Sequence, residues 1–181
     1  MSTFKYEDPY KWTLKESLSQ TMCDDWRTWI YERHPDLFDK FKHGDWVKPA
    51  TASYPPSILR VEKYYENLDG KHVFNASESY SILAKDTFGY PEYPYKFGLF
   101  KKAESEYIKE ILTAVARKKG IIEGQPFFSA DNDLCTESIF TPCYDIVSNE
   151  LWFSYGIVYR DGKWGKSIEE ALESINKAEN E

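Results

Sequence analysis

The chain has 181 residues, of which 41% are hydrophobic and 17% aromatic, and its formal charge at pH 7 is −7. This length and apolar content suit one globular domain of ordinary size and exclude disorder of the whole chain. The acidic balance argues against a protein that binds the phosphate backbone of nucleic acids directly, because such proteins need a basic face. An acidic surface instead favours encounter with a basic partner, although many proteins are acidic only for solubility.

The compartment is predicted from the cysteines and from the apolar runs. Three cysteines, an odd number, and an N-terminal stretch without an apolar core of signal length indicate a reducing cytoplasm. No run approaches the 18 apolar residues of a membrane-spanning helix, so no membrane segment is expected. Residues 1–8 and 177–181 are polar or charged and are expected to be frayed.

The first predicted element is a long helix that begins near residue 13 and ends before Pro35. Thr13 and Glu16 have the spacing of a capping box. Apolar residues then recur every fourth position, which places them on one helix face: Leu14, Leu18, Met22, Trp26 and Ile30. A second, short helix is expected from Pro35 to Gly44.

The middle of the chain predicts a hairpin after a loop. Residues 45–57 contain three prolines and are expected to form a loop. Branched and aromatic residues in 58–65 and 72–76 are typical of strands, and Asp69-Gly70 between them is a hairpin-turn signal. Residues 77–88 fit a helix or a strand equally well.

Residues 87–100 form an aromatic-rich segment that is expected to be a loop. Pro91 and Pro94 lack the N–H that a central strand requires, and Gly89 and Gly98 allow bends. Its rings cannot all face one side of a regular element: Phe88, Tyr90, Tyr93, Tyr95, Phe97 and Phe100. They either bind a partner or cover the edge of a core.

The C-terminal half predicts a second long helix at 101–119, a strand at 151–159 and a C-terminal helix. Asp161-Gly162 is a tight-turn signal, and Ser167 with Glu170 has capping-box spacing before the apolar positions of 168–175. The order of these elements predicts an α+β fold in one domain spanning 1–181. An antiparallel sheet of hairpins would pack with two long helices and a short C-terminal helix.

The acidic stretch DNDLCTE, residues 131–137, is the sharpest polar cluster. Its carboxylates could ligate calcium or magnesium, but the glycine and the acid that an EF-hand loop requires are replaced by Thr136 and Pro142. An acidic surface loop is the favoured interpretation. No paired cysteine or histidine spacing indicates zinc either, so no metal and no cofactor are expected.

An enzyme remains an alternative hypothesis. Cys135 or Cys143 with His72 could form a thiolate nucleophile activated by an imidazole, as in a small hydrolase or transferase. Neither cysteine lies in a family-type signature. No phosphate-binding loop, dinucleotide fingerprint, serine-hydrolase elbow or zinc-protease motif occurs in the sequence.

A protein-binding function without catalysis is favoured by the length, by the acidic charge and by two loops, residues 87–100 and 131–137. In size and character the chain resembles bacterial toxin-immunity proteins, which are small, often acidic, cytoplasmic proteins that cover a toxin or nuclease domain. No family motif is matched, and a phage anti-defence protein would have the same character. The residues expected to contact a basic partner are the carboxylates Asp131, Asp133 and Glu137 and the rings Tyr90, Tyr93 and Tyr95.

Overall fold

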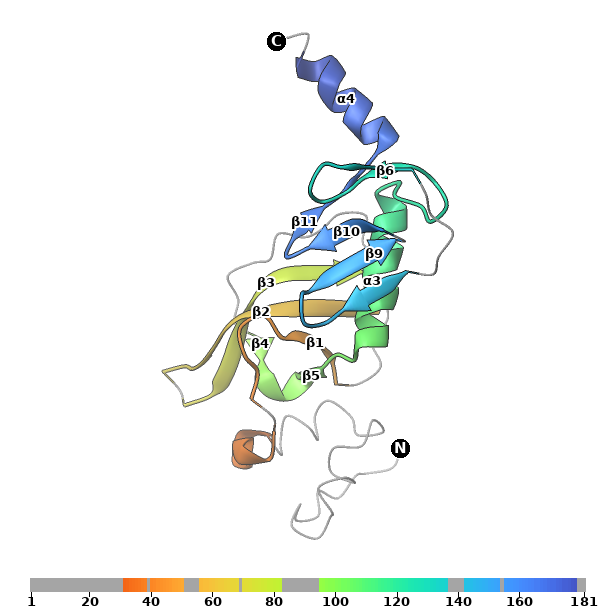
Figure 1. The fold of residues 1–181 in the computed structure, drawn as a ribbon. Coiled ribbons are helices and arrows are strands. Elements are labelled where there is room, and N and C mark those ends of the chain that lie inside the picture. Colours follow the sequence, from red (N-terminus) through yellow and green to blue (C-terminus); the bar gives the residue numbers. More distant parts are fainter. Residues whose placement is uncertain are drawn as a thin grey trace, which may run out of the picture. The chain divides into compact units, whose positions relative to one another are not determined.

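The computed structural model describes residues 31–38, 40–50, 56–68, 70–82, 95–136, 142–153 and 155–178. The chain divides into two compact units. Figure 1 labels many of the helices and strands. The first comprises Met1–Ser79 and Leu83–Ala103, and the second comprises Tyr80–Ile82 and Glu104–Glu181. The expectation of a single domain stays a prediction.

The first unit is built on a five-stranded sheet in the order β4-β3-β2-β1-β5. Its elements are η2 (Pro35–Leu37), β1 (Trp46–Pro49), β2 (Ser57–Glu66), β3 (His72–Ser81), β4 (Tyr95–Lys96), η3 (Phe97–Leu99) and β5 (Phe100–Lys102). The strand pair β1–β2 is antiparallel, with Val47 opposite Leu59, and β5 lies on the other side of β1. The branched and aromatic residues of β2 and β3 supply most of their buried positions, and both strands are partly buried, as the sequence predicts.

The core of the first unit is largely aromatic. Phe74 on β3 is fully buried and contacts three rings at centroid distances of 5.2 to 5.5 Å: Phe41, Tyr95 and Phe100. The contacts with Phe41 and Phe100 are edge-to-face and the contact with Tyr95 is stacked. Both arrangements add to the stabilisation from apolar burial. The side chains of Tyr31, Phe38, Val47, Leu59 and Val61 complete this core.

The second unit combines two helices with two small sheets. Its elements are α3 (Ser105–Lys118), β6 (Phe127–Phe128), β7 (Leu134–Cys135), β8 (Cys143–Asp145), β9 (Glu150–Phe153), β10 (Gly156–Arg160), β11 (Lys163–Trp164), β12 (Lys166–Ser167) and α4 (Ile168–Ala178). One sheet has the order β11-β10-β9-β8 and the other β12-β6-β7. Helix α3 packs against β8 and β9.

Period-2 alternation explains the burial of β9. Leu151 and Phe153 are fully buried, whereas Glu150 and Trp152, which alternate with them, are half-buried on the opposite face. The buried face of α3 carries Ile108, Ile111, Leu112 and Val115. The capping interaction predicted for the C-terminal helix is present, because the backbone N–H of Glu170 donates to Ser167 Oγ at 3.1 Å.

The fold is therefore α+β with antiparallel strand pairs, as predicted, but several details differ. The described strands form three sheets rather than one. Of the two predicted long helices, α3 begins at Ser105 rather than at residue 101, because 100–102 pair with β1 as β5. The other lies outside the described residues except for its end, where residues 31–33 are helical.

The predicted loop 45–57 contains strand β1, and Tyr95–Lys96 in the predicted aromatic loop forms strand β4. Of the predicted short helix 35–44, only the 3-10 turn Pro35–Leu37 is helical in the described residues. Residues 1–8 and 179–181 of the expected frayed ends lie outside the described part, and α4 includes Lys177 and Ala178. Neither α3 nor α4 is long and apolar enough to cross a membrane, and the same holds for every helix in the described ranges.

Candidate partner-binding surface

The residues predicted to bind a partner fall into different parts of the chain. Tyr90, Tyr93 and Glu137 lie outside the described residues. Tyr95 belongs to the first unit, where its half-buried ring stacks on Phe74 at 5.3 Å, so much of this ring is used for packing. Asp131 and Asp133 belong to the second unit, and the surface around them is the candidate site.

A tight turn between β6 and β7 presents Asp131 and Asp133. The hydroxyl of Ser129, a buried residue, accepts hydrogen bonds from the backbone N–H groups of Asp131 at 3.2 Å and Asp133 at 3.1 Å. Asn132 adopts a positive φ of 66°, a conformation that asparagine tolerates better than most residues. The local sequence thus builds a turn with a defined backbone, and both aspartates are exposed on it.

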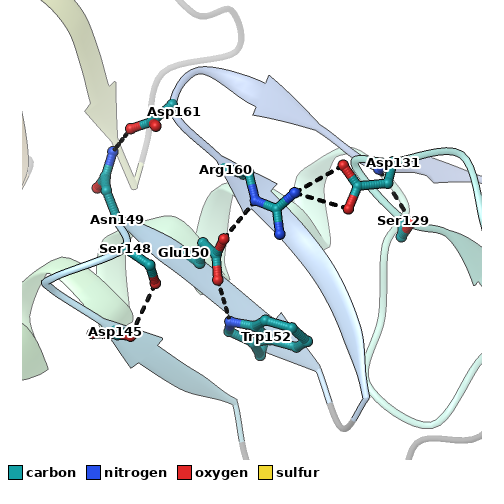
Figure 2. A network of polar contacts seen from close by, with 9 residues as sticks. All are labelled: Ser129, Asp131, Asp145, Ser148, Asn149, Glu150, Trp152, Arg160 and Asp161. Carbon is teal, nitrogen blue, oxygen red and sulfur yellow. Dashed lines mark hydrogen bonds and ion pairs between the residues drawn. The ribbon is translucent and has the colours of Figure 1, made fainter.

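Arg160 on β10 ties this turn to the four-stranded sheet (Figure 2). Its Nη1 donates to both carboxylate oxygens of Asp131, at 3.0 and 2.9 Å, and its Nε donates to Glu150 Oε1 at 2.5 Å. The other oxygen of Glu150 accepts a hydrogen bond from Trp152 Nε1 at 3.0 Å. The hydrogen bond to Glu150, followed by the negative charges of Glu150 and then of Asp131, raises the pKa of Arg160.

The two aspartates therefore differ. The charge of Asp131 is matched by Arg160, whose Nη1 contacts both oxygens of the carboxylate. The carboxylate of Asp133 makes no hydrogen bond or ion pair with any residue in the described ranges. Of the two, Asp133 offers the less compensated charge to an incoming cation.

Strand register extends the network into a row of charged residues across the sheet. Asp145 on β8 lies opposite Glu150 on β9, Glu150 lies opposite Arg160 on β10, and Arg160 lies opposite Lys163 on β11. Residues opposite each other in antiparallel strands project to the same face. We call these four residues the charged row: Asp145, Glu150, Arg160 and Lys163.

The turn that joins β8 to β9, next to the charged row, is held by side chains. Asp145 accepts a hydrogen bond from the backbone N–H of Val147 at 2.9 Å. It accepts another from the hydroxyl of Ser148, also at 2.9 Å (Figure 2). These two bonds lower the pKa of the Asp145 carboxyl, so it is ionised at neutral pH. Val147 is 91% exposed on this turn.

Asn149 connects this turn to the turn between β10 and β11. Its Nδ2 donates to Asp161 Oδ1 at 2.9 Å, and its Oδ1 accepts from the hydroxyl of Tyr144 at 2.7 Å. The side chain is buried, and its backbone has a positive φ of 53°. A buried amide that is hydrogen-bonded at both its nitrogen and its oxygen helps to fix the relative position of the two turns.

The surface built from these parts is acidic. Five carboxylates, of Asp131, Asp133, Asp145, Glu150 and Asp161, stand against the two cations of Arg160 and Lys163, which gives a formal charge of −3. A surface with this net charge attracts cations, although it also carries two positive side chains. Chemically, it can bind a basic group.

Sequence reasoning missed Arg160, Asn149 and the charged row. A signal for the pair Glu150 and Arg160 was present in the sequence. These two residues flank a largely apolar run, and a hairpin formed by that run places them opposite each other. The pairing of Arg160 with Asp131 had no local signal.

The alternative hypothesis of a cysteine nucleophile depends on the surroundings of Cys135, Cys143 and His72. Cys135 is half-buried, and burial, followed by the negative charge of Asp133, raises the pKa of its thiol. Cys143 is exposed. His72 belongs to the first unit, where its Nδ1 lies 2.6 Å from the hydroxyl of Tyr64 and its ring stacks on that of Tyr64. Within the described ranges, no group of three or more His, Cys, Asp or Glu side chains could hold a metal ion.

Comparisons with protein-family models, with curated proteins and with solved structures give no significant match to this chain. The interpretation of the site therefore depends on its own geometry and charge.

Proposed function

We propose that this chain is a non-catalytic, protein-binding inhibitor of the immunity type. It would neutralise a basic toxin or nuclease domain by covering its surface, in the cytoplasm, and would need no cofactor, membrane or direct contact with nucleic acid. The charged row and the β6–β7 turn would form part of the contact surface. Asp133 would pair with a Lys or Arg of the partner.

The observation that carries this proposal is the pre-organised acidic surface of the second unit. Its carboxylates sit on turns and strands held by side-chain hydrogen bonds, so little conformational entropy would be lost on binding. The net charge of −7 adds a long-range attraction for a basic partner, which raises the association rate.

The enzyme alternative receives less support. A nucleophilic cysteine needs a lowered thiol pKa, and the pKa of Cys135 is raised by burial and by Asp133. The exposed Cys143 is the remaining candidate for that hypothesis.

The first experiment captures partners from the native cell lysate with the tagged chain, washing at low and then at high salt. We expect a basic protein in stoichiometric amount that is retained at low salt and weakened at high salt. Mass spectrometry would identify it, and inhibition of its activity by the chain would then be measured. A chain that retains no basic protein, or one that leaves its partner's activity unchanged, contradicts the proposal.

The role of the acidic surface is tested with Asp133→Lys. We expect at least a fivefold slower association with the purified partner at low salt, and a smaller effect at high salt. Glu110→Lys is the matched control, because it makes the same charge change at an exposed position on α3. Equal effects of the two variants would show that only the net charge matters and would remove the β6–β7 turn from the interface.

A further inference from the structure

Among the described helices and strands of the second unit, helix α4 is the least buried. None of its 11 residues is buried, and Leu172 and Ile175 are each 55% exposed. The helix is nevertheless well formed at its start, where Ser167 caps it. An isolated helix of this length is marginal in water, because helices in proteins gain most of their stability from packing an apolar face.

The apolar residues of α4 have the spacing of a packed face. Ile168, Ala171, Leu172 and Ile175 occupy positions i, i+3, i+4 and i+7, which lie along one side of a helix. Helix α3 has the same spacing in Ile108, Ile111, Leu112 and Val115, and there all four are buried. The same pattern is thus covered in one helix and largely open in the other.

The charges on α4 indicate what kind of surface would cover it. Glu169, Glu170 and Glu173 are exposed, and their carboxylates make no hydrogen bond or ion pair with the residues that the structure describes. With Lys177, the helix carries a formal charge of −2, within a chain of charge −7. A second copy of the chain would bring like charges together, whereas a groove edged by Lys and Arg would neutralise them.

We propose that α4 docks as an amphipathic helix into an apolar groove of the partner protein, and that Lys and Arg side chains line the rim of this groove. Anchors at i, i+3, i+4 and i+7 are the pattern by which helices are recognised in such grooves. The inference rests on the proposed function, because the partner is the same basic protein. It adds a second contact, in which Leu172 and Ile175 are buried and slow the dissociation of the complex.

The test uses the full chain with Leu172→Gln and Ile175→Gln together. Glutamine forms helices at least as well as isoleucine and carries no charge, so the variant removes apolar surface and leaves helix propensity and net charge nearly unchanged. The matched control is Ser174→Gln with Asn176→Gln, which places the same residue type outside the apolar positions of the same helix. Circular dichroism and the thermal midpoint check that each variant is folded.

The probe is the basic protein that the wild-type chain retains at low salt and releases at high salt, purified and immobilised. We expect the Leu172/Ile175 variant to dissociate at least tenfold faster with an association rate within twofold of wild type. The control should keep both rates. A second variant, Glu169→Gln with Glu173→Gln, keeps the apolar face and should slow association at low salt.

Each failure has its own signature. An unchanged dissociation rate in the Leu172/Ile175 variant, with slower association in Asp133→Lys, would overturn the role of α4 and leave the proposed function standing. Sedimentation of the wild type as a dimer and of the Leu172/Ile175 variant as a monomer would show that a second copy covers α4, which also overturns the inference. If the wild type retains no basic protein, the proposed function and this inference fail together.

Discussion

Asp131 and Arg160 are 29 positions apart in the sequence, yet Nη1 of the arginine donates to both carboxylate oxygens of the aspartate, at 3.0 and 2.9 Å. The same guanidinium donates through Nε to Glu150 on the neighbouring strand. One side chain thus connects the β6–β7 turn of the three-stranded sheet with two strands of the four-stranded sheet. The acidic turn is thus linked to the four-stranded sheet through this arginine.

Replacing Arg160 by glutamine should have opposite effects on stability and on binding. Loss of the guanidinium leaves Asp131 and Glu150 without their cation, so we expect a lower urea midpoint for unfolding. The surface becomes more acidic by one charge, so we expect association with the basic partner to become severalfold faster at low salt. Urea titration and stopped-flow association at two salt concentrations measure the two effects.

Arg117→Gln is the matched control for this variant. Arg117, near the C-terminal end of α3, pairs with Glu123, so the substitution makes the same charge change at another ion pair. Its effect on association should be smaller than that of Arg160→Gln. Slower association in Arg160→Gln would mean that the arginine positions the turn more than it masks its charge.

Local signals in the sequence were sufficient for several elements. The turn at Gly70 between β2 and β3 and the tight turn at Asp161-Gly162 are present, because glycine supplies the positive φ of 72° and 83° that these turns need. The C-terminal helix is confirmed as α4, and most of the predicted helix 101–119 is confirmed as α3. Each of these predictions depended on residues that are close in sequence.

The elements that the sequence did not reveal depend on distant partners. Trp46–Pro49 contains a proline and few strand signals of its own, but β1 lies between β2 and β5 and is stabilised by both. Strand β5 likewise interrupts the start of the predicted helix because it pairs with β1. The charged row requires the register of four strands, which no local pattern specifies.

The stability of the β8–β9 turn should depend on pH through Asp145. Hydrogen bonds from the Val147 N–H and the Ser148 hydroxyl lower the pKa of this carboxyl below its ordinary value of about 3.9. Its contribution to stability is therefore present above that ordinary pKa and is lost as the pH falls through the lower pKa of the folded state. An NMR titration of the Asp145 carboxyl carbon should give a midpoint below the ordinary value.

Two variants separate the causes of this shift. Ser148→Ala removes one donor and should move the Asp145 pKa upward, toward its ordinary value. Asp145→Asn retains an acceptor for the Val147 N–H but no charge, so its urea midpoint should vary less than that of the wild type between pH 5 and pH 2. A midpoint for Asp145 at or above its ordinary pKa would contradict the hydrogen-bonded turn.

Gly165 should not tolerate a side chain. It lies between β11 and β12, and a Cβ atom at this position would collide with the backbone carbonyl oxygen of Phe128 on β6. Backbone cannot rotate away as a side chain can, so Gly165→Ala should lower the free energy of unfolding by about 1–3 kcal/mol. Gly44→Ala is a useful comparison, since a Cβ there has ordinary contacts and its cost would come from a positive φ of 85°.

Urea denaturation followed by tryptophan fluorescence would measure both glycine variants. The loss in Gly165→Ala should be accompanied by disturbed pairing between Lys166 and Phe128, visible as faster amide exchange in β6 and β12. A fully stable Gly165→Ala protein would show that β12 can move away from β6 at no cost.

Thiol labelling should distinguish Cys135 from Cys143 and test the enzyme alternative. Burial and the charge of Asp133 raise the pKa of Cys135, whereas Cys143 is exposed, so with Cys23→Ser as background we expect Cys143 to react at least tenfold faster at pH 7. Asp133→Asn removes the nearby negative charge and should speed the labelling of Cys135 severalfold, with little change at Cys143. Mass spectrometry of the labelled peptides gives both rates. Rapid labelling of Cys135 below neutral pH would instead mean an activated thiolate, and the hypothesis of a cysteine enzyme would then take precedence over the inhibitor.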